Sequence, residues 1–70
     1  MSTELFLNGF YIEVTLSEDE DWQKDAIYIY DCLSSMREEE RDSLIEYLYS
    51  EGFVQDRKTR CEVIRGEDCL

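Results

Sequence analysis

The dipeptide Asn8-Gly9 lies between two short runs in which apolar and polar side chains alternate. Asn-Gly is the favoured pair for a two-residue type I′ turn, because both positions of that turn require a positive φ. We therefore predict a β-hairpin over residues 3–16. The turn sets the register, which places Leu7 opposite Phe10. By the two-residue period of a strand, the predicted core face then comprises Leu5, Leu7, Phe10, Ile12, Val14 and Leu16.

The opposite face of this hairpin carries two cross-strand pairs of different character. One pair is Phe6 with Tyr11, and the next is Glu4 with Glu13. Directly opposed like charges are mildly destabilising in a sheet. Two interpretations follow: either a neighbouring third strand supplies Lys58 or Arg60 to neutralise the pair, or the two carboxylates belong to a binding site.

A first helix is predicted to begin at Glu18 and to reach about residue 36. Residues 17–20, Ser-Glu-Asp-Glu, have the spacing of a capping box, and carboxylates are favoured in the first turn by the helix dipole. Tyr28 would point away from the core, and Ile27 would serve either helix packing or self-association. The predicted core stripe, at helical spacing, comprises Trp22, Ala26, Ile29, Tyr30 and Leu33, with Met36 near the end.

A second helix is predicted over residues 36–51. Ser35 and Glu38 repeat the capping-box spacing, and Gly52 followed by Phe53 is a typical helix stop. The predicted inward side comprises Leu44, Ile45 and Leu48. The opposite side presents Glu39, Asp42 and Glu46, at spacing i, i+3 and i+7.

The segment 60–65 alternates and predicts a third strand. The predicted order is therefore ββααβ, an α+β fold in which a three-stranded sheet is covered on one face by two helices. Seventy residues suffice for one small domain over residues 1–70. The other sheet face, with Phe6 and Tyr11, would be partly exposed.

The chain is strongly acidic, with 18 Asp and Glu against 7 Lys and Arg and a formal charge of -11. The excess lies in residues 1–56, because the remaining segment contains nearly equal numbers of acids and bases. The charge therefore belongs to the folded body rather than to a tail. It serves either solubility or attraction to a basic surface.

Several classes of function are disfavoured. The chain has no histidine for acid–base catalysis, no glycine-rich phosphate loop and no nucleophile elbow. The three cysteines, Cys32, Cys61 and Cys69, lack C-x-x-C spacing and do not predict a zinc site. The acidic run of residues 18–21 lacks the pattern of a calcium loop. We expect no enzyme, cofactor or metal. The composition favours a reducing cytoplasm, and no apolar run is long enough to span a membrane.

A one-sided choice of acid favours a basic partner, because a mixed Lys and Glu surface would serve solubility equally well. Proteins that bind nucleic acids recognise backbone charge, so a rigid row of carboxylates can compete with phosphates. Cys32 and Cys61 are interpreted as buried or boundary residues. The candidate partner-binding residues are Glu18, Asp19, Glu20, Asp21, Tyr28, Asp31, Glu38, Glu39, Asp42 and Glu46.

In small size, αβ pattern and outer carboxylates such as 18–21 and 38–40, the chain resembles phage-encoded inhibitors, including anti-CRISPR and anti-restriction DNA mimics. This resemblance implies a stoichiometric inhibitor in the bacterial cytoplasm. It would cover the basic DNA- or RNA-binding site of a defence complex such as a CRISPR effector, without touching nucleic acid or membrane. The alternatives are an acidic adaptor or antitoxin-like partner, and a homodimeric structural subunit, although we expect a monomer.

Overall fold

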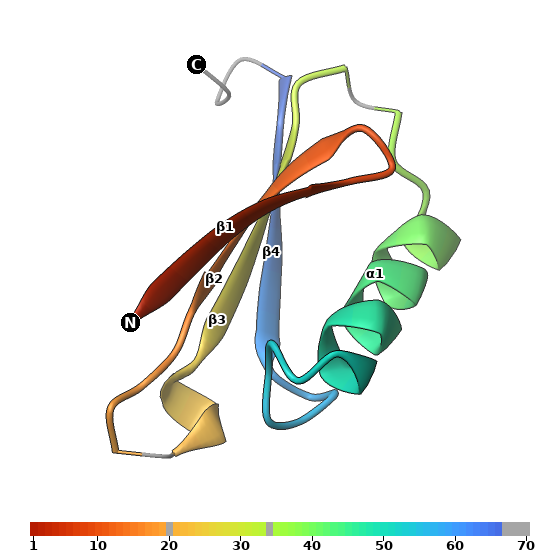
Figure 1. Ribbon diagram of the computed structural model, residues 1–70. Helices are drawn as coiled ribbons and strands as arrows, with labels where there is room; N and C mark the ends of the chain where they lie inside the picture. The colour runs from red at the N-terminus through yellow and green to blue at the C-terminus, as the bar shows by residue number, and fades with distance from the viewer. Residues whose placement is uncertain (20, 34, 67–70) are drawn as a thin grey trace.

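The computed structural model describes residues 1–19, 21–33 and 35–66 (Figure 1). Within these residues the chain forms one four-stranded mixed sheet in the order β1-β2-β3-β4, with one α-helix. β1 and β2 are antiparallel, as are β2 and β3, whereas β3 and β4 are parallel. The elements are β1 (Ser2–Leu7), β2 (Phe10–Thr15), the 3-10 turn η1 (Trp22–Lys24), β3 (Ala26–Asp31), α1 (Glu38–Ser50) and β4 (Arg60–Arg65).

The N-terminal hairpin has the predicted turn and register. Asn8 and Gly9 both take positive φ, 52° and 86°, as a type I′ turn requires. Leu7 is paired with Phe10, and the opposed Glu4 and Glu13 are neighbours across the strands. The predicted core face is confirmed, because Phe10, Ile12 and Val14 are buried and Leu5, Leu7 and Leu16 pack against the buried cluster.

The predicted three-stranded sheet with two helices is wrong, because the described residues between Glu18 and residue 36 do not form the predicted helix. The segment instead contains a loop, the short turn η1 and the strand β3. The run Ala-Ile-Tyr-Ile-Tyr is rich in β-branched and aromatic residues, which fit a pleated surface better than a helix. Its alternation of aliphatic and aromatic side chains satisfies the two-residue period, and this period prevails over the capping-box signal.

The strand changes which side chains of this segment enter the core. Ile27 and Ile29 are both 0% exposed, although helical spacing had placed Ile27 off the core stripe. Leu33, predicted as a core residue, is 86% exposed in the loop after β3. Tyr28 and Tyr30 are half-buried on the other side of the sheet.

The helix α1 confirms the second predicted helix to within two residues at each end. It begins later than predicted, with Arg37 as its N-cap and the Glu40 carboxylate accepting from the Arg37 N–H at 3.3 Å. It ends in a Schellman motif, in which the Phe53 N–H donates to the Leu48 carbonyl at 2.8 Å. Gly52 provides the left-handed residue that this motif requires, with φ 83°.

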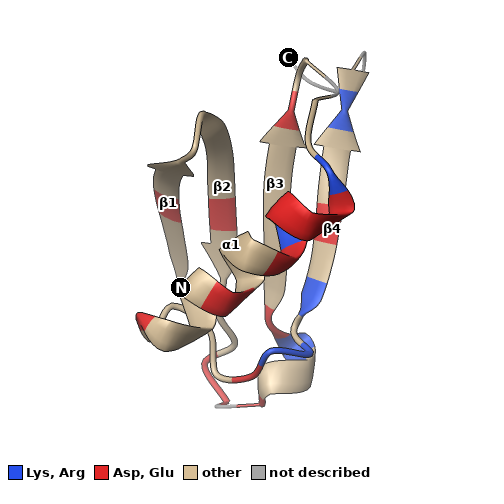
Figure 2. Cartoon of the chain, turned by 90° about the vertical axis from the view of Figure 1, so that its right-hand side faces the viewer, with Lys and Arg blue, Asp and Glu red and all other residues tan. Residues whose placement is uncertain are grey.

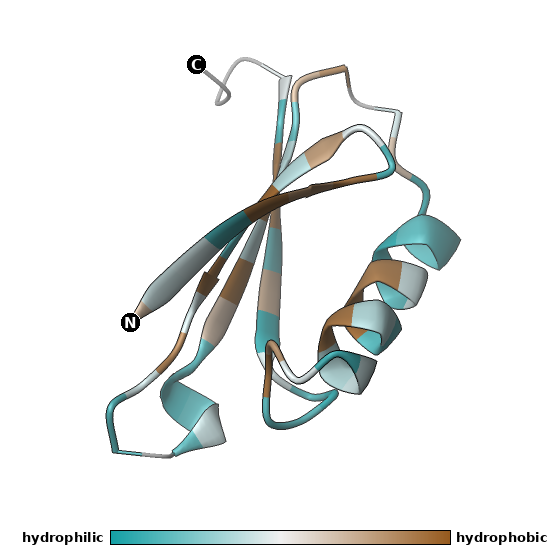
Figure 3. Cartoon of the chain, viewed as in Figure 1, coloured by the Kyte–Doolittle hydropathy of each residue, from teal (hydrophilic) through white to brown (hydrophobic). Residues whose placement is uncertain are grey.

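The core lies between α1 and one face of the sheet. Leu44 and Leu48 of α1 are buried, and the apolar side of the helix is turned towards the sheet (Figure 3). Because β3 and β4 are parallel, the chain needs a crossover between them, and α1 supplies it. The buried cluster comprises Phe10, Ile12, Val14, Ile27, Ile29, Met36, Leu44, Leu48 and Val54. In the described part of the chain, no helix covers the opposite face of the sheet (Figure 1).

Candidate functional site

The predicted partner-binding residues do not form one surface. Tyr28 and the helix α1 lie on opposite sides of the sheet, and Asp31 is buried at the end of β3. Glu20 lies outside the described residues. The remaining acids divide between the β2–β3 loop, with Glu18, Asp19 and Asp21, and α1, with Glu38, Glu39, Asp42 and Glu46.

Among the described elements, α1 has the most exposed acidic residues, and Figure 2 shows the acidic positions of this helix in red. We call Glu38, Glu39, Asp42 and Glu46 the α1 acidic side. All four are exposed, as the helical spacing predicted for Glu39, Asp42 and Glu46. In its whole length α1 contains one basic residue, Arg41, and its first turn is Glu-Glu-Glu. The helix dipole favours carboxylates at that end, so part of this charge stabilises the helix.

Two arginines form ion pairs with part of the α1 acidic side. Arg41 Nη2 lies 3.8 Å from Glu38 Oε1 and 3.4 Å from Asp42 Oδ1, and Arg57 Nη2 lies 2.9 Å from Glu46 Oε1. Within the described part of the chain, Glu39 makes no ion pair. The pairs with Glu38, Asp42 and Glu46 are solvent-exposed, and exposed pairs contribute only about 0–1 kcal/mol each. They can therefore be exchanged for pairs with a partner at small cost.

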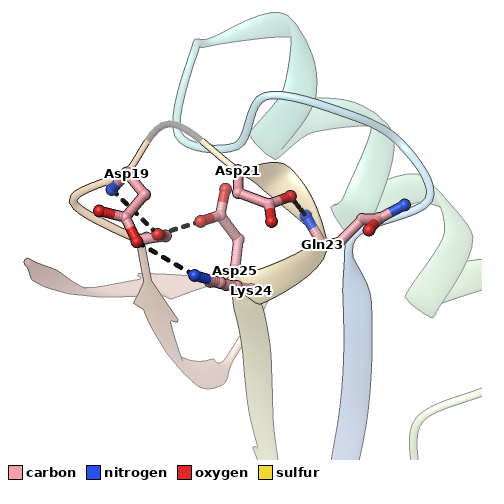
Figure 4. A network of polar contacts seen from close by, with 6 residues as sticks. Asp19, Asp21, Gln23, Lys24 and Asp25 are labelled. Atoms are coloured by element: carbon pink, nitrogen blue, oxygen red, sulfur yellow. Dashed lines mark hydrogen bonds and ion pairs between the residues drawn. The ribbon is translucent and has the colours of Figure 1, made fainter.

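The acids of the β2–β3 loop mainly organise the loop itself (Figure 4). Lys24 Nζ lies 3.0 Å from Asp19 Oδ2, and the Asp21 carboxylate accepts from the Gln23 N–H at 3.0 Å. Buried Asp25 accepts from the Ser17 N–H at 2.6 Å and so joins the two ends of the loop. Glu18, Asp19 and Asp21 were predicted to line the first turn of a helix, and that prediction is wrong because they lie in a loop, in which Asp19 and Asp21 make local contacts.

Asp31 is a structural residue rather than an exposed binding residue. Its side chain is 1% exposed, and its two carboxylate oxygens accept from the N–H groups of Ser35 at 3.1 Å and Met36 at 2.9 Å. These bonds hold the loop that leads into α1. Asp31 was placed in the predicted binding set as an exposed helix residue, and its position at the end of β3 removes it from that set.

The uncovered face of the sheet forms a second surface, most of which the sequence reasoning missed. The strand pairing aligns Phe6, Tyr11, Tyr30 and Ile64 in one row across the four strands, and Glu4, Glu13, Tyr28 and Glu62 in the next. The rings of Phe6 and Tyr11 lie 5.4 Å apart, and those of Tyr11 and Tyr30 lie 5.3 Å apart. The alternation in residues 26–30 was the signal that would have placed both tyrosines of β3 on this face.

Two charged contacts define the electrostatics of this face. Arg60 Nη2 donates to the Tyr28 hydroxyl at 2.9 Å, and the Arg60 guanidinium lies over the Tyr28 ring. Arg60 therefore does not neutralise the opposed Glu4 and Glu13. Desolvation raises the pKa of Tyr11 to about 12, helped by a hydrogen bond and the charge of Glu4 and, to a lesser extent, by the charge of Glu13.

A half-open pocket of 590 Å³ adjoins the end of the aromatic row. It lies between the β1–β2 turn and the loop that follows β3. Phe6, Tyr11, Tyr30 and the exposed Leu33 are among the residues that line it. The pocket therefore offers mainly apolar and aromatic surface beside the carboxylates of the next row.

Comparison of the chain with protein families, with curated proteins and with solved structures finds no match in any of the three. In the described ranges, no group of three or more Cys, Asp and Glu side chains is arranged to hold a metal ion. No helix among these residues combines the length and the apolar character that crossing a membrane requires.

The cysteines lie in different settings. Cys61 is a free, half-buried thiol on β4, and burial raises its pKa to about 11, so little thiolate is present at neutral pH. Cys32 is exposed and lines the pocket, which corrects its interpretation as a buried or boundary residue. Cys69 lies outside the described residues.

Proposed function

We propose that this chain is a non-enzymatic binding protein that inhibits by stoichiometric occupation of a basic site. The α1 acidic side would dock on the DNA- or RNA-binding surface of a host defence complex, in the manner of anti-CRISPR proteins, in the bacterial cytoplasm. The observation that carries the proposal is the set of four exposed carboxylates on one helix, with a single basic residue in that helix.

The packing of α1 supports this function. Leu44 and Leu48 anchor the helix in the core, so the backbone that bears the carboxylates is rigid and loses little freedom on binding. From Glu38 to Glu46 the helix rises by about 12 Å, which is comparable to several phosphates along one strand of a duplex. The formal charge of -11 adds long-range attraction to a basic partner and accelerates the encounter.

A second candidate function is an acidic adaptor or antitoxin-like partner that does not imitate nucleic acid. Tyr47 and Tyr49 of α1 favour it, because they are 43% and 39% exposed beside the carboxylates. Tyrosine often contributes interface energy in protein–protein complexes, whereas pure charge mimicry has no need of it. Displacement by nucleic acid distinguishes the two functions.

The experiment is capture of partners from bacterial lysate on the immobilised chain, followed by elution with salt or with duplex DNA. A triple variant of the α1 acidic side, Glu39→Gln with Asp42→Asn and Glu46→Gln, should lose most of the retained partner. The control is Glu4→Gln with Glu13→Gln and Glu62→Gln, which removes three charges from the opposite face. We call these the α1 variant and the sheet variant.

The outcomes separate the functions. Loss with the α1 variant alone, together with elution by DNA, supports the inhibitor. Loss with the α1 variant but indifference to DNA supports the adaptor. Equal loss of the same partner with both variants would show that net charge, rather than α1, accounts for its binding. A partner lost only with the sheet variant would bind the opposite face, and unchanged retention with the α1 variant would reject both functions.

A further inference from the structure

We propose that the uncovered sheet face is a second binding site, which takes an extended cationic segment of a partner protein. An apolar side chain of that segment enters the pocket beside Phe6 and Tyr11, and an arginine or lysine lies on the carboxylates of Glu4 and Glu13. This site lies across the sheet from α1 and is independent of the function proposed for the α1 acidic side.

The apolar part of the site is exposed surface that nothing in the described chain covers. Phe6 is 73% exposed at the edge of the aromatic row, and Leu33, which also lines the pocket, is 86% exposed. A mainly apolar concavity with a few polar neighbours is the usual form of a site that receives a partner's side chain. The volume of 590 Å³ easily holds one aromatic or aliphatic side chain.

The charge of the neighbouring row selects the partner. Glu4 and Glu13 are directly paired across β1 and β2, and neither makes an ion pair with any described residue. Side chains opposed in this way lie about 5 Å apart, so one cation can contact both carboxylates. The repulsion between them is a small standing cost to the fold, and a bound cation would remove it.

Two arginines of the chain already lie over tyrosine rings, which shows how a partner's arginine could contact a tyrosine of this face. Arg60 lies 6.0 Å from the centre of the Tyr28 ring on the same face, and Arg57 lies 4.7 Å from the centre of the Tyr49 ring. Tyr11 and Tyr30 have no such cation among the described residues. A partner arginine can therefore combine stacking on a tyrosine with the charge of the adjacent carboxylates.

The spacing of the two rows indicates the form of the segment. Phe6 and Glu4 are two residues apart on β1, as are Tyr11 and Glu13 on β2, so the rows are separated by about 7 Å. In an extended segment parallel to the strands, side chains at i and i+2 face the same way at the same spacing. The predicted recognition pattern is therefore an apolar residue, any residue, and an arginine or lysine.

Charge argues against the other occupants. A second copy would bring its own charge of -11, and an isologous contact would set Glu4, Glu13 and Glu62 against the same carboxylates. A nucleic acid would be repelled by these side chains in the same way, despite the aromatic row. A cationic protein segment is the occupant that satisfies both rows.

The test is a titration of the isotope-labelled chain with the pentapeptide Ser-Phe-Ser-Arg-Ser, blocked at both ends and followed by backbone amide chemical shifts. We expect shifts in β1, β2 and β3 around the aromatic row, at millimolar peptide. The control peptide Ser-Phe-Ser-Glu-Ser should bind more weakly by about tenfold, because it sets a carboxylate against two others.

The two variants locate the site. The sheet variant should weaken binding of the arginine peptide by about threefold to tenfold, and the α1 variant, with the same charge, should leave it within about twofold. Phe6→Ala should also weaken it, because the pocket loses one wall. Shifts centred on α1, equal binding of both peptides, equal effects of both variants, or no shifts would each overturn the proposal. A dimer seen by sedimentation, with this face protected in the free protein, would assign the face to a second copy instead.

Discussion

Tyr11 is the residue in which the chemistry of the open sheet face can be measured directly. Its pKa is raised from 10.0 to about 12, first by desolvation and then by the hydrogen bond and charge of Glu4. The folded chain therefore favours the neutral phenol. The stability that this preference contributes is fully present below pH 10 and is lost as the pH rises towards about 12.

Replacement of Glu4 tests that assignment. Glu4→Gln removes the neighbouring charge and should lower the pKa of Tyr11 part of the way towards its ordinary value, since desolvation remains. An alkaline titration of tyrosinate absorbance measures this pKa. Subtracting the titration curve of Tyr11→Phe separates the signal of Tyr11 from that of the other tyrosines. An unchanged titration in Glu4→Gln would show that Glu4 does not contact Tyr11 in solution.

Two buried aspartates offer a second measurement at the scale of single residues. Both oxygens of Asp31 accept backbone N–H groups, so Asp31→Asn turns one acceptor into a donor and should lower the free energy of unfolding by about 1–3 kcal/mol. Asp25 accepts through Oδ1, while its buried Oδ2 has no hydrogen-bond partner in the described structure. Asp25→Asn can keep the hydrogen bond from the Ser17 N–H, so this substitution should lower the free energy of unfolding by less than about 1 kcal/mol. Urea denaturation compares them, and an equal loss would contradict the role assigned to Asp31.

Among the elements, β3 is where the chain departs from its sequence prediction, and two substitutions distinguish strand from helix. Ile27→Ala should cost about 2–5 kcal/mol, because its side chain is fully buried between the sheet and α1. Leu33→Ala should change stability by less than about 0.5 kcal/mol, since Leu33 is 86% exposed. Helical spacing predicts the reverse order. Denaturation of the two variants under the same conditions decides between the strand and the helix.

The elements that were predicted correctly are those in which local chemistry agrees with the tertiary environment. The Asn8-Gly9 turn sets its own register, and Gly52 ends α1 whatever surrounds it. In residues 22–33 two periods compete, because apolar side chains satisfy both the strand and the helix spacing. The strand is stabilised by pairing with β2 and β4, which are distant in sequence, and local reasoning does not include that contribution.

For the whole molecule, sequence reasoning gave the amount of charge but only part of its placement. The exposure of Glu39, Asp42 and Glu46 followed from helical spacing and is confirmed. The ion pair between Glu46 and Arg57 depends on how the segment between α1 and β4 packs beside α1, and no local sequence pattern shows that packing. Because Ala26–Asp31 is a strand rather than part of a helix, Tyr28 lies on the sheet face opposite α1. The one predicted surface is therefore two surfaces.

The excess of 18 acids over 7 bases makes a prediction for the stability of the molecule as a whole. From about 0.01 M to about 1 M sodium chloride the Debye length falls from about 30 Å to about 3 Å, so repulsion across the domain is screened. Salt also weakens the exposed pairs such as Lys24 with Asp19, but these contribute little. Stability should therefore rise by about 1 kcal/mol, or about 4–8 °C in Tm for a domain of this size.

Calorimetry at several salt concentrations measures this rise, and the α1 variant supplies its control. With three fewer carboxylates the variant has less repulsion to screen, so its Tm should rise less with salt than that of the parent chain. The sheet variant removes the same charge, including the opposed pair of Glu4 and Glu13, and should also gain a little stability at low salt. A Tm that falls with added chloride would mean that the ion pairs outweigh the repulsion.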